Sequence, residues 1–390
     1  MRIGIYGGTF SPPHIGHIRS ANAAAGELRL DLLIIVPAGI PLHKTLPVGT
    51  PPADIRYLMA CLAFAGTQNV IVSDVEAGNP EPTYSIDTVL SIAREYPGAD
   101  LFLMVGTDMY ITLDSWKDSD ILIEAVTPAV FSRGPADLKK IVSYSRSLME
   151  RYNIKTEIIQ NDVVEISSSQ LREMLPRRKG VRYINDTTYS YIIKERLYGA
   201  KPDWDWLRAK AYSMLSPERI PHVAGCEEES LRLAERWGVD PDDAREAAIL
   251  HDITKKLSFD ENIKVLEEHG VCVGTLEHAG EKLLHSKTGA MLARSVFGVS
   301  DGVADAIMWH TTGRAGMSAL EKVIYLADYI EPERDFAGVG ALRELAYSDI
   351  DDAMKMGLSM SIADMKERGI MPNRTTFDAL SDLLSKGTMI

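Results

Sequence analysis

Residues 7–17 read GGTFSPPHIGH and bring paired glycines, two hydroxyl side chains and two histidines into one short string. The string follows the apolar run from Arg2 to Tyr6 and precedes a helical pattern, which is where α/β sheets bind phosphate groups. Glycines let the backbone approach an anion, and His14 and His17, three positions apart, can donate to phosphate oxygens. Neither a Walker A loop nor a dinucleotide fingerprint has this spacing. We therefore expect a nucleoside triphosphate site that supports nucleotidyl transfer without a covalent intermediate.

A second hydroxyl-rich string, ISSSQLR, occupies residues 166–172. Its three serines are placed to open a helix with Arg172 about one turn inside it, so hydroxyls, free N–H groups and a guanidinium form a second phosphate cradle. The serines could also act only as helix caps. Further candidates follow later apolar runs. The candidate ATP-binding residues are Gly7, Gly8, Thr9, Phe10, His14, His17, Gly106, Asp108, Arg133, Ser167, Ser168, Ser169 and Arg172.

Loops after the intervening runs could hold a second substrate. PAGIPLHK, residues 37–44, is stiffened by two prolines and presents His43 and Lys44. The hydroxyls of TYSIDT could contact a substrate or cap a helix, and Trp116 could stack on a heteroaromatic ring or belong to the core. The candidate substrate-binding residues are Lys44, Thr83, Tyr84, Ser85 and Trp116. The candidate catalytic residues in this half of the chain are His14, His17, Lys44 and Arg172.

Histidine and aspartate dominate the candidate chemistry of the second half. Burying imidazoles and carboxylates without partners is costly, and metal coordination explains why they occur on apolar helical patterns. The candidate ligands are His222, His251, Asp252, His285, His310 and Asp328. This mixed nitrogen and oxygen set suits Fe, Mn or Zn and not Ca. The adjacent His251 and Asp252 follow the apolar stretch AREAAIL and could bind one metal or bridge two.

Two cationic side chains lie near the histidine pattern. Lys255, one turn after the His-Asp doublet, and Arg314 could neutralise polyphosphate charge, or each could be an ordinary surface residue. We count Asp252 and Lys255 as the candidate catalytic residues of this half. His269 and His278 lie in a Glu-rich stretch and are interpreted as surface residues.

Short β-branched runs alternate with helical patterns in the first half, which predicts a doubly wound parallel α/β sheet over residues 1–198. The expected strands are residues 2–6, 32–36, 70–72, 101–105, 129–131 and 157–159. Ligands of such sheets bind beyond the carboxyl ends of the strands, where the candidate residues lie. Gly and Pro in YGAKPD mark a linker, placed at residues 199–208. Helical periods follow, so residues 209–385 are expected to form an all-α metal-binding domain.

The composition is that of a globular protein, with 45% hydrophobic and 25% charged residues. The length of 390 residues is enough for two domains. The net charge of −13 argues against a nucleic-acid polymer as partner. Three widely separated cysteines favour a reducing compartment over a disulfide framework. With no leader pattern and no apolar run that could span a bilayer, we expect a cytoplasmic protein without membrane contact. An oligomer is compatible with the sequence.

Five strings together resemble the bacterial nicotinate mononucleotide adenylyltransferases: GGTFSPPHIGH, PAGIPLHK, TYSIDT, GTDMYITLDSW and ISSSQLR. The resemblance covers residues 1 to about 198 and implies the nucleotidylyltransferase type of α/β sheet. It also implies transfer of AMP from ATP, carried with Mg²⁺, to nicotinate mononucleotide in NAD biosynthesis. The products would be nicotinate adenine dinucleotide and pyrophosphate.

The same resemblance implies roles for individual residues. His14, His17 and Arg172 would hold the triphosphate with Lys44 nearby, while Ser85 and Trp116 would contact the nicotinate end. Ser11 stands where the family usually has Asp. Phosphopantetheine adenylyltransferases share the histidine motif and are the alternative.

In the second half, the order H…HD…H…H…D resembles the HD metal-dependent phosphohydrolases. AAILHDITK, LLHSKTGAMLA, AIMWHTTGRAGMSALEK and YLADYIEPERDF are similar to the branch that cleaves diadenosine tetraphosphate symmetrically to two ADP. This resemblance implies a dinuclear Fe, Mn or Zn centre bound by the six candidate ligands, with Asp252 as the bridge. Two alternatives stay open: a regulatory nucleotide sensor, or a hydrolase of another nucleotide phosphoester.

Overall fold

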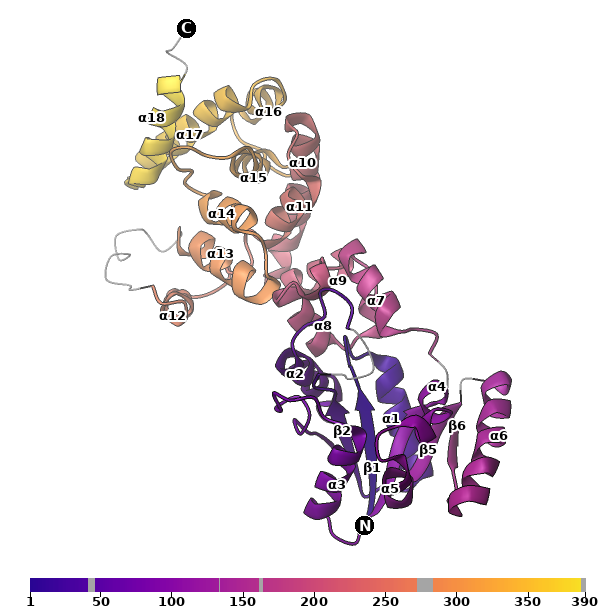
Figure 1. The fold of residues 1–390 in the computed structure, drawn as a ribbon. Helices are drawn as coiled ribbons and strands as arrows, with labels where there is room; N and C mark the ends of the chain where they lie inside the picture. The colour runs from indigo at the N-terminus through magenta and orange to yellow at the C-terminus, as the bar shows by residue number, and fades with distance from the viewer. Residues whose placement is uncertain (41–45, 133, 161–163, 272–282, 387–390) are drawn as a thin grey trace. The chain divides into compact units, whose positions relative to one another are not determined.

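The computed structural model describes residues 1–40, 46–132, 134–160, 164–271 and 283–386. The chain divides into two compact units, Met1–Pro202 and Asp203–Ile390, which we call the first and second domains (Figure 1). Among the described residues, no helix combines the length and the apolar character needed to cross a membrane.

A six-stranded parallel sheet forms the centre of the first domain, with strand order β3-β2-β1-β4-β5-β6. The strands are β1 Arg2–Gly8, β2 Leu32–Pro37, β3 Val70–Val72, β4 Asp100–Gly106, β5 Thr127–Ser132 and β6 Glu157–Gln160. The six predicted runs are therefore confirmed as strands, each within two residues of its predicted ends. The strand order reverses between β1 and β4, so the ligand crevice is expected at their carboxyl ends.

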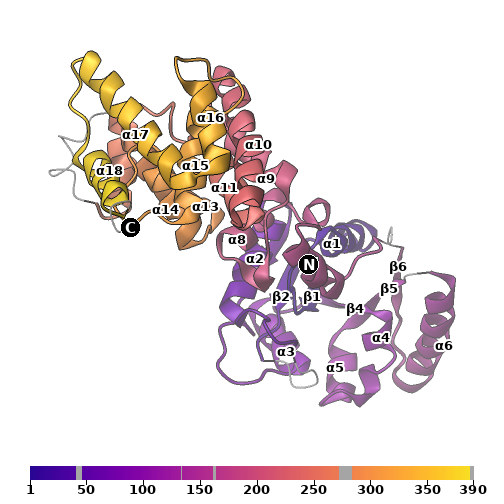
Figure 2. The same ribbon diagram turned by 90° about the horizontal axis from the view of Figure 1, so that it is seen from above.

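Helices cover both faces of this sheet, which confirms the doubly wound α/β fold (Figure 2). One apolar cluster includes side chains of α3, α5 and α6, and another includes side chains of α1 and α2. The helices are α1 Ile15–Glu27, α2 Ala53–Phe64, α3 Ser85–Glu95, α4 Thr107–Tyr110, α5 Ser119–Ala125, α6 Pro135–Tyr152, α7 Ser168–Met174 and α8 Asp186–Lys194. Because both faces are covered, the buried middle residues of the central strands β1 and β4 carry no charge, and the charged Arg2 and Asp100 stand at the strand starts.

The regular elements among the described residues of the second domain are all helices, as the helical periods predict. Its helices are α9 Trp204–Ser213, α10 Ile220–Trp237, α11 Pro241–Leu250, α12 Phe259–Glu268, α13 Leu284–Phe297, α14 Asp301–Trp309, α15 Ala319–Ile330, α16 Val339–Ser348, α17 Ile350–Glu367 and α18 Arg374–Lys386. The first of them begins inside the predicted linker, because the carboxylate of Asp203 accepts hydrogen bonds from the N–H groups of Asp205 and Trp206 and caps it.

Candidate functional site

A pocket of about 720 Å³ in the first domain brings the two predicted phosphate cradles together. It includes the strand-end residue Gly106 of β4, and Gly7 and Gly8 of β1. A Cβ at Gly7 would meet no heavy atom within 4 Å, so the glycine leaves space for a ligand. The predicted ATP-binding residues that line the pocket are Gly7, Gly8, Thr9, Phe10, His14, His17, Gly106, Asp108, Ser167, Ser168, Ser169 and Arg172. Its size is that of an ordinary small-molecule site.

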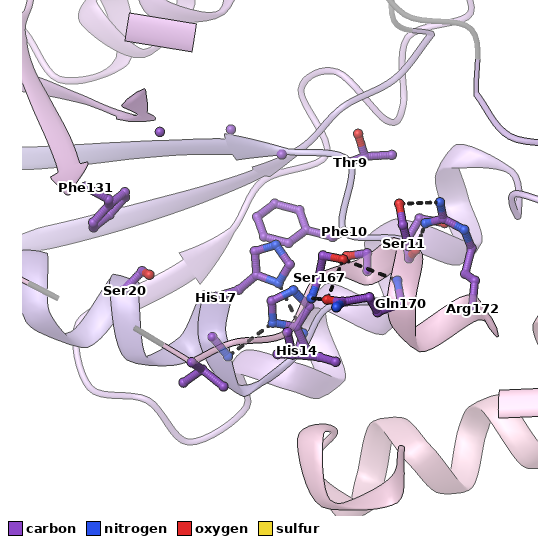
Figure 3. A pocket seen from close by; sticks show the side chains of 18 of the residues that line it. Thr9, Phe10, Ser11, His14, His17, Ser20, Phe131, Ser167, Gln170 and Arg172 are labelled. Atoms are coloured by element: carbon purple, nitrogen blue, oxygen red, sulfur yellow. Dashed lines mark hydrogen bonds between the residues drawn. The ribbon is translucent and has the colours of Figure 1, made fainter. Parts of the chain in front are cut away.

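His14 and His17 lie at the start of α1 with their rings 3.8 Å apart (Figure 3). Nδ1 of His14 accepts a hydrogen bond from the backbone N–H of Gly16, and Nδ1 of His17 accepts one from the N–H of His14. Because each Nδ1 is an acceptor, the proton of each neutral ring is on Nε2. Burial lowers the pKa of His14 to about 4 and that of His17 well below its usual value. Both rings are therefore neutral donors at pH 7.

Phe10 forms the turn that leads from β1 into the histidine string. Its φ of 47° is in the left-handed region, which is uncommon for an aromatic residue. The side chain is fully buried and packs edge-on against Tyr6, Phe64 and His17. Aromatic packing therefore offsets the backbone strain at this turn.

The start of α7 is joined to the histidine string by direct hydrogen bonds. Arg172 donates to the carbonyl of Ser11 at 2.7 Å and to Oγ of Ser169 at 3.0 Å (Figure 3). Ser168 donates to the carbonyl of Pro12 at 2.9 Å. Ser167 accepts a hydrogen bond from the N–H of Gln170 and caps the helix. The serines thus act as a cap and as a clasp between segments more than 150 residues apart.

Ser11 is buried and its Oγ lies 3.1 Å from the hydroxyl of Tyr198. Burial raises the pKa of Tyr198 to about 12, so the phenol stays neutral. A carboxylate at position 11 would need a charged partner or water in this place, whereas the serine hydroxyl is satisfied by the phenol. Ser11 is therefore accommodated here as a neutral residue.

The histidines and aspartates predicted as metal ligands converge in the second domain. The carboxylate of Asp252 is fully buried and its two oxygens face different groups. Oδ2 lies 3.4 Å from Nε2 of His251 and 3.9 Å from Nε2 of His222, and Oδ1 lies 3.3 Å from Nε2 of His285 and 3.7 Å from Nε2 of His310. Each oxygen of Asp252 therefore faces two imidazole nitrogens, and one carboxylate is shared by four histidines.

Asp328 completes the first of these groups, since its Oδ1 lies 3.0 Å from Nε2 of His222. Metal–ligand bonds of about 2.0–2.2 Å put neighbouring ligand atoms about 3.0–3.6 Å apart, which matches most of these separations. Within the described part of the chain, Nε2 of His251 and Oδ1 of Asp252 are buried without a hydrogen-bond partner. Buried nitrogen and oxygen atoms that lack hydrogen-bond partners and have this spacing fit the ligand positions of a metal centre.

Outer partners hold the rings with Nε2 inward. Nδ1 of His251 lies 2.7 Å from the carbonyl of Ala248, and Nδ1 of His310 lies 2.7 Å from the carbonyl of Ile307, so Nδ1 is the protonated nitrogen in both. Nδ1 of His222 lies 3.0 Å from the buried carboxylate of Glu331. These contacts leave the lone pair of each Nε2 for a ligand position.

Lys255 places its ammonium 2.9 Å from Nε2 of His285, which must accept because an ammonium only donates. Nε2 of His285 and Nε2 of His310 are then two acceptors that face each other at 3.3 Å. The Lys255 ammonium supplies one positive charge beside this pair, and a proton or a metal ion between the two nitrogens would remove their repulsion.

Cationic side chains already lie against both carboxylates. Arg219 contacts Oδ2 of Asp252 at 2.6 Å, and Arg334 contacts Oδ1 of Asp328 at 2.9 Å. Burial raises the pKa of Asp252, but His251 and the other imidazoles outweigh it and hold that pKa well below its usual value. Asp252 is thus ionised, and both carboxylates are already paired with guanidinium groups.

Comparisons with known proteins agree with this division. Residues 5–174 match the cytidylyltransferase-like family. A probable nicotinate-nucleotide adenylyltransferase of Rubrobacter xylanophilus is 32% identical over 201 residues, which are 51% of this chain and 93% of the relative. The chain belongs to the nicotinate-nucleotide adenylyltransferase family. A relative with the same description from Geobacter sulfurreducens is 29% identical over 213 residues, 51% of this chain and 98% of the relative.

Membership is carried by the first domain, which we now call the adenylyltransferase domain. A solved structure of the Plasmodium falciparum nicotinic acid mononucleotide adenylyltransferase, complexed with NaAD, is 21% identical, covers 51% of this chain and 98% of its own, and has a TM-score of 0.42.

The second domain is an HD domain, which matches its family over residues 219–333. A solved Clostridium acetobutylicum protein, described as a predicted HD superfamily hydrolase involved in NAD metabolism, is 35% identical. It covers 47% of this chain and 97% of its own, with a TM-score of 0.46. Family membership and the ligand geometry agree on a metal site in this domain.

Some predicted residues lie elsewhere in the adenylyltransferase domain. His43, Lys44 and Arg133 lie outside the described residues. The described lining of the pocket does not include Thr83, Tyr84, Ser85 or Trp116. Tyr84 and Trp116 are instead half-buried against the apolar cluster of the α3 face, and Lys117 lies 4.0 Å from the centre of the Tyr84 ring.

Other predicted residues of the HD domain also have defined surroundings. Arg314 contacts Glu321 at 2.7 Å and Asp305 at 3.2 Å, so its charge is used in ion pairs on the protein. His269 is exposed and lies near the Ser295 hydroxyl, as expected of a surface residue. His278 lies outside the described residues.

Arg56 of α2 is a residue that the sequence pattern did not single out in the adenylyltransferase domain. Its side chain is fully buried and its guanidinium donates to four carbonyls. These belong to Thr9 at 3.0 Å, Ala38 at 2.5 Å, Gly39 at 2.8 Å and Pro51 at 3.2 Å. Arg56 therefore joins the loops that follow β1 and β2. Its only sequence signal is a charged residue on an otherwise apolar helical face.

Close backbone packing adds to this junction. A Cβ on Gly39 would lie 2.3 Å from the carbonyl oxygen of Glu76, so this position requires glycine. The Glu76 carboxylate accepts a hydrogen bond from Thr88 at 2.7 Å. The loop after β2 is thus held by both backbone contact and a buried cation.

Replacing Arg56 by Met is expected to loosen the two loops. Unpaired buried carbonyls should lower the free energy of unfolding of the adenylyltransferase domain by about 3 kcal/mol. Hydrogen–deuterium exchange of the full chain should show faster exchange in peptides covering residues 7–10 and 36–40. Arg19→Met, at an exposed position of α1, is the matched control and should change neither. Unchanged exchange in Arg56→Met would show that the guanidinium does not order the loops.

Proposed function

We propose that the adenylyltransferase domain transfers AMP from ATP to nicotinate mononucleotide, giving nicotinate adenine dinucleotide and pyrophosphate. The observation that carries the proposal is the convergence of His14, His17 and Arg172 in one pocket at the carboxyl ends of β1 and β4. The names of the relatives support the choice of mononucleotide. The serine-rich start of α7 closes the same pocket.

The side chains contribute by position and charge. The neutral Nε2–H groups of His14 and His17 donate to triphosphate oxygens, and Arg172 offsets charge on the leaving pyrophosphate together with the Mg²⁺ that accompanies ATP. The mononucleotide phosphate attacks the α-phosphorus in line, so no protein nucleophile is required. In this proposal Lys44 assists at the triphosphate, and Ser85 and Trp116, which are not part of the described lining of the pocket, hold the nicotinate end.

A substrate panel tests this assignment. With ATP and Mg²⁺, the full chain is expected to adenylylate nicotinate mononucleotide much faster than nicotinamide mononucleotide or phosphopantetheine. Initial rates of pyrophosphate release, compared at equal substrate concentration, measure the preference. An equal rate for the amide would remove the acid specificity, and a higher rate for phosphopantetheine would replace the proposed substrate.

We further propose that the HD domain hydrolyses diadenosine tetraphosphate to two ADP. Six ligands, His222, His251, Asp252, His285, His310 and Asp328, would hold two ions of Fe, Mn or Zn. The opposed oxygens of Asp252 are the observation that supports a pair of metals. Such a pair supplies an activated water and neutralises charge on the phosphate under attack. Lys255, next to His285, would neutralise a further phosphate, and Arg314 is the more remote candidate.

Product analysis separates this activity from its alternatives. With added Mn²⁺, Fe²⁺ or Zn²⁺, ADP should be the sole nucleotide product from diadenosine tetraphosphate, and a chelator should stop its formation. AMP plus ATP would show asymmetric cleavage. Tight binding without turnover would favour the nucleotide sensor, and faster hydrolysis of a mononucleotide would favour another phosphoester.

A further inference from the structure

Cys226 lies one helical turn after His222 on α10, so the two side chains share a face of the helix. Its side chain is 1% exposed, and Sγ lies 3.5 Å from Nε2 of His222, the ring nitrogen that faces Asp328. One ligand atom from each of His222, Cys226, His251 and Asp328 lies within 4.8 Å of the others. The thiol thus belongs spatially to one end of the proposed metal centre.

The spacing is that of two ligands on one ion. With metal–sulfur and metal–nitrogen bonds of about 2.3 and 2.0 Å, a tetrahedral angle puts the two ligand atoms about 3.5 Å apart. Sγ of Cys226 and Nε2 of His222 are separated by 3.5 Å. Without a metal the thiol can donate to that Nε2, so its hydrogen bond occupies the lone pair that a metal would take.

A separate observation indicates that a ligand belongs at this place. Nε2 of His251, whose side chain is 1% exposed, is buried with no hydrogen-bond partner within the described part of the chain. It lies in the same group of atoms as the thiol. A Cβ on Gly225 would lie 2.7 Å from Oε2 of Glu331, so a larger residue at this position would displace the carboxylate that orients His222.

We propose that Cys226 is a sulfur ligand of the centre, at the end formed by His222, His251 and Asp328. The proposal rests on the metal centre of the proposed function and adds a ligand to it. Coordination releases the thiol proton to solvent and forms one metal–sulfur bond. The other end, with His285 and His310, has no such ligand among the described residues. Because thiolates favour softer ions, the sulfur end should prefer Zn²⁺ or Fe²⁺ over Mn²⁺.

Cobalt spectroscopy of the metal-stripped full chain tests this ligand. Co²⁺ bound by thiolate gives a sulfur-to-metal charge-transfer band in the near ultraviolet, besides the visible bands that imidazole and carboxylate ligands produce. The wild-type protein should show both. Cys226→Ser and the nearly isosteric Cys226→Val should lose the near-ultraviolet band and retain visible bands. Cys61→Ser and Cys272→Ser, altered at the other two cysteines, should keep both.

Metal competition gives a second readout. Relative to wild type, Cys226→Ser should lose at least about tenfold in its preference for Zn²⁺ over Mn²⁺. Tenfold is the lower limit because loss of even an outer partner of a metal ligand costs about that much in metal affinity. Circular dichroism of the metal-free variants checks that they are folded, and Cys226→Val replaces Cys226→Ser if the serine variant is not.

The outcomes are distinct. Cobalt bound without the near-ultraviolet band in wild type, or a band that persists in both Cys226 variants, overturns the sulfur ligand and leaves the metal centre standing. No bound cobalt in folded wild-type protein overturns the metal centre and the sulfur ligand together.

Discussion

Replacing Asp252 by Asn is expected to abolish phosphohydrolysis by the HD domain while adenylyl transfer continues at the wild-type rate. Asn has the shape of Asp but no charge, and only one of its two terminal atoms can bind a metal. Since a bound metal contributes several kcal/mol and each ~1.4 kcal/mol is tenfold in rate, the loss should be about 10³-fold or more. Diadenosine tetraphosphate turnover and metal content of the same preparation measure it.

The structure explains why so small a change should matter. The Asp252 side chain is fully buried, and its two oxygens serve the two halves of the ligand set, with His251 on one side and His285 on the other. Metal content should therefore fall for both ions and not for one alone.

Asp364→Asn is the matched control for this variant. Asp364 is on α17 in the same domain and forms an exposed ion pair with Arg368, so hydrolysis and metal content should stay unchanged. Adenylyl transfer reports on the rest of the chain in both variants. Full hydrolysis by Asp252→Asn would contradict the bridging role, and loss of both activities would show that the domains are coupled or that the protein has unfolded.

Replacing His14 by Asn is expected to lower kcat for adenylyl transfer by about 10²–10³-fold, the usual cost of removing one donor to developing charge. Nδ1 of His14 caps α1 by accepting from Gly16, and the Asn side-chain oxygen can take over this cap. The Nε2–H donor is lost. The variant therefore separates the structural role of the ring from its role toward the triphosphate.

Position 17 offers a paired comparison. His17→Gln places an amide N–H near the former Nε2 and can still accept from the His14 N–H, whereas His17→Asn is too short to reach the phosphate. The Gln variant should keep markedly more activity than the Asn variant. Equal activities would show that the cap, and not the donor, is what transfer requires. Thermal unfolding of both variants checks the helix.

The low pKa of His14 predicts the pH dependence of the free enzyme. Since the pKa falls from 6.5 to about 4 on burial, the folded domain holds this ring neutral. Below pH 6.5 the unfolded chain binds a proton at His14 that the folded domain does not bind. The free energy of unfolding is therefore unaffected by this group above pH 6.5 and declines as the pH falls toward 4. Correspondingly, kcat/KM for ATP should show no loss from His14 protonation until the pH approaches 4. A loss centred near pH 6.5 would contradict the buried, neutral state of the ring.

Local sequence patterns were enough to predict most of the strands and the helical nature of the second domain. The β-branched runs identified the strands of the sheet, because a strand covered on both faces must be apolar along its length. Helical periods identified the second domain for a similar reason. The positions of GGTFSPPHIGH after β1 and of His251 and Asp252 after α11 also followed from local order alone.

Contacts between distant segments could not be read in this way. Ser11 and Arg172 are 161 positions apart, and their hydrogen bond depends on the order of the strands. Arg56 was missed because its partners are backbone carbonyls, which every residue carries and no sequence pattern distinguishes. Glu331 was missed because it acts through His222, and only the packing of α10 against α15 brings it near that ring. Cys226 was missed although it lies four residues after His222 on α10, because a single cysteine does not make a CxxC metal pattern.

The sequence by itself therefore determined which residue types and which folds are present: a parallel sheet with a phosphate-binding histidine string, and a helical domain with a set of histidines and aspartates. Periodicity and local spacing carry that information along a single element. Only the tertiary structure decided the tautomers of the histidines, the opposed directions of the Asp252 oxygens and the burial of Cys226 beside His222, His251 and Asp328. These depend on the relative placement of several helices, and therefore on side-chain packing across the whole domain.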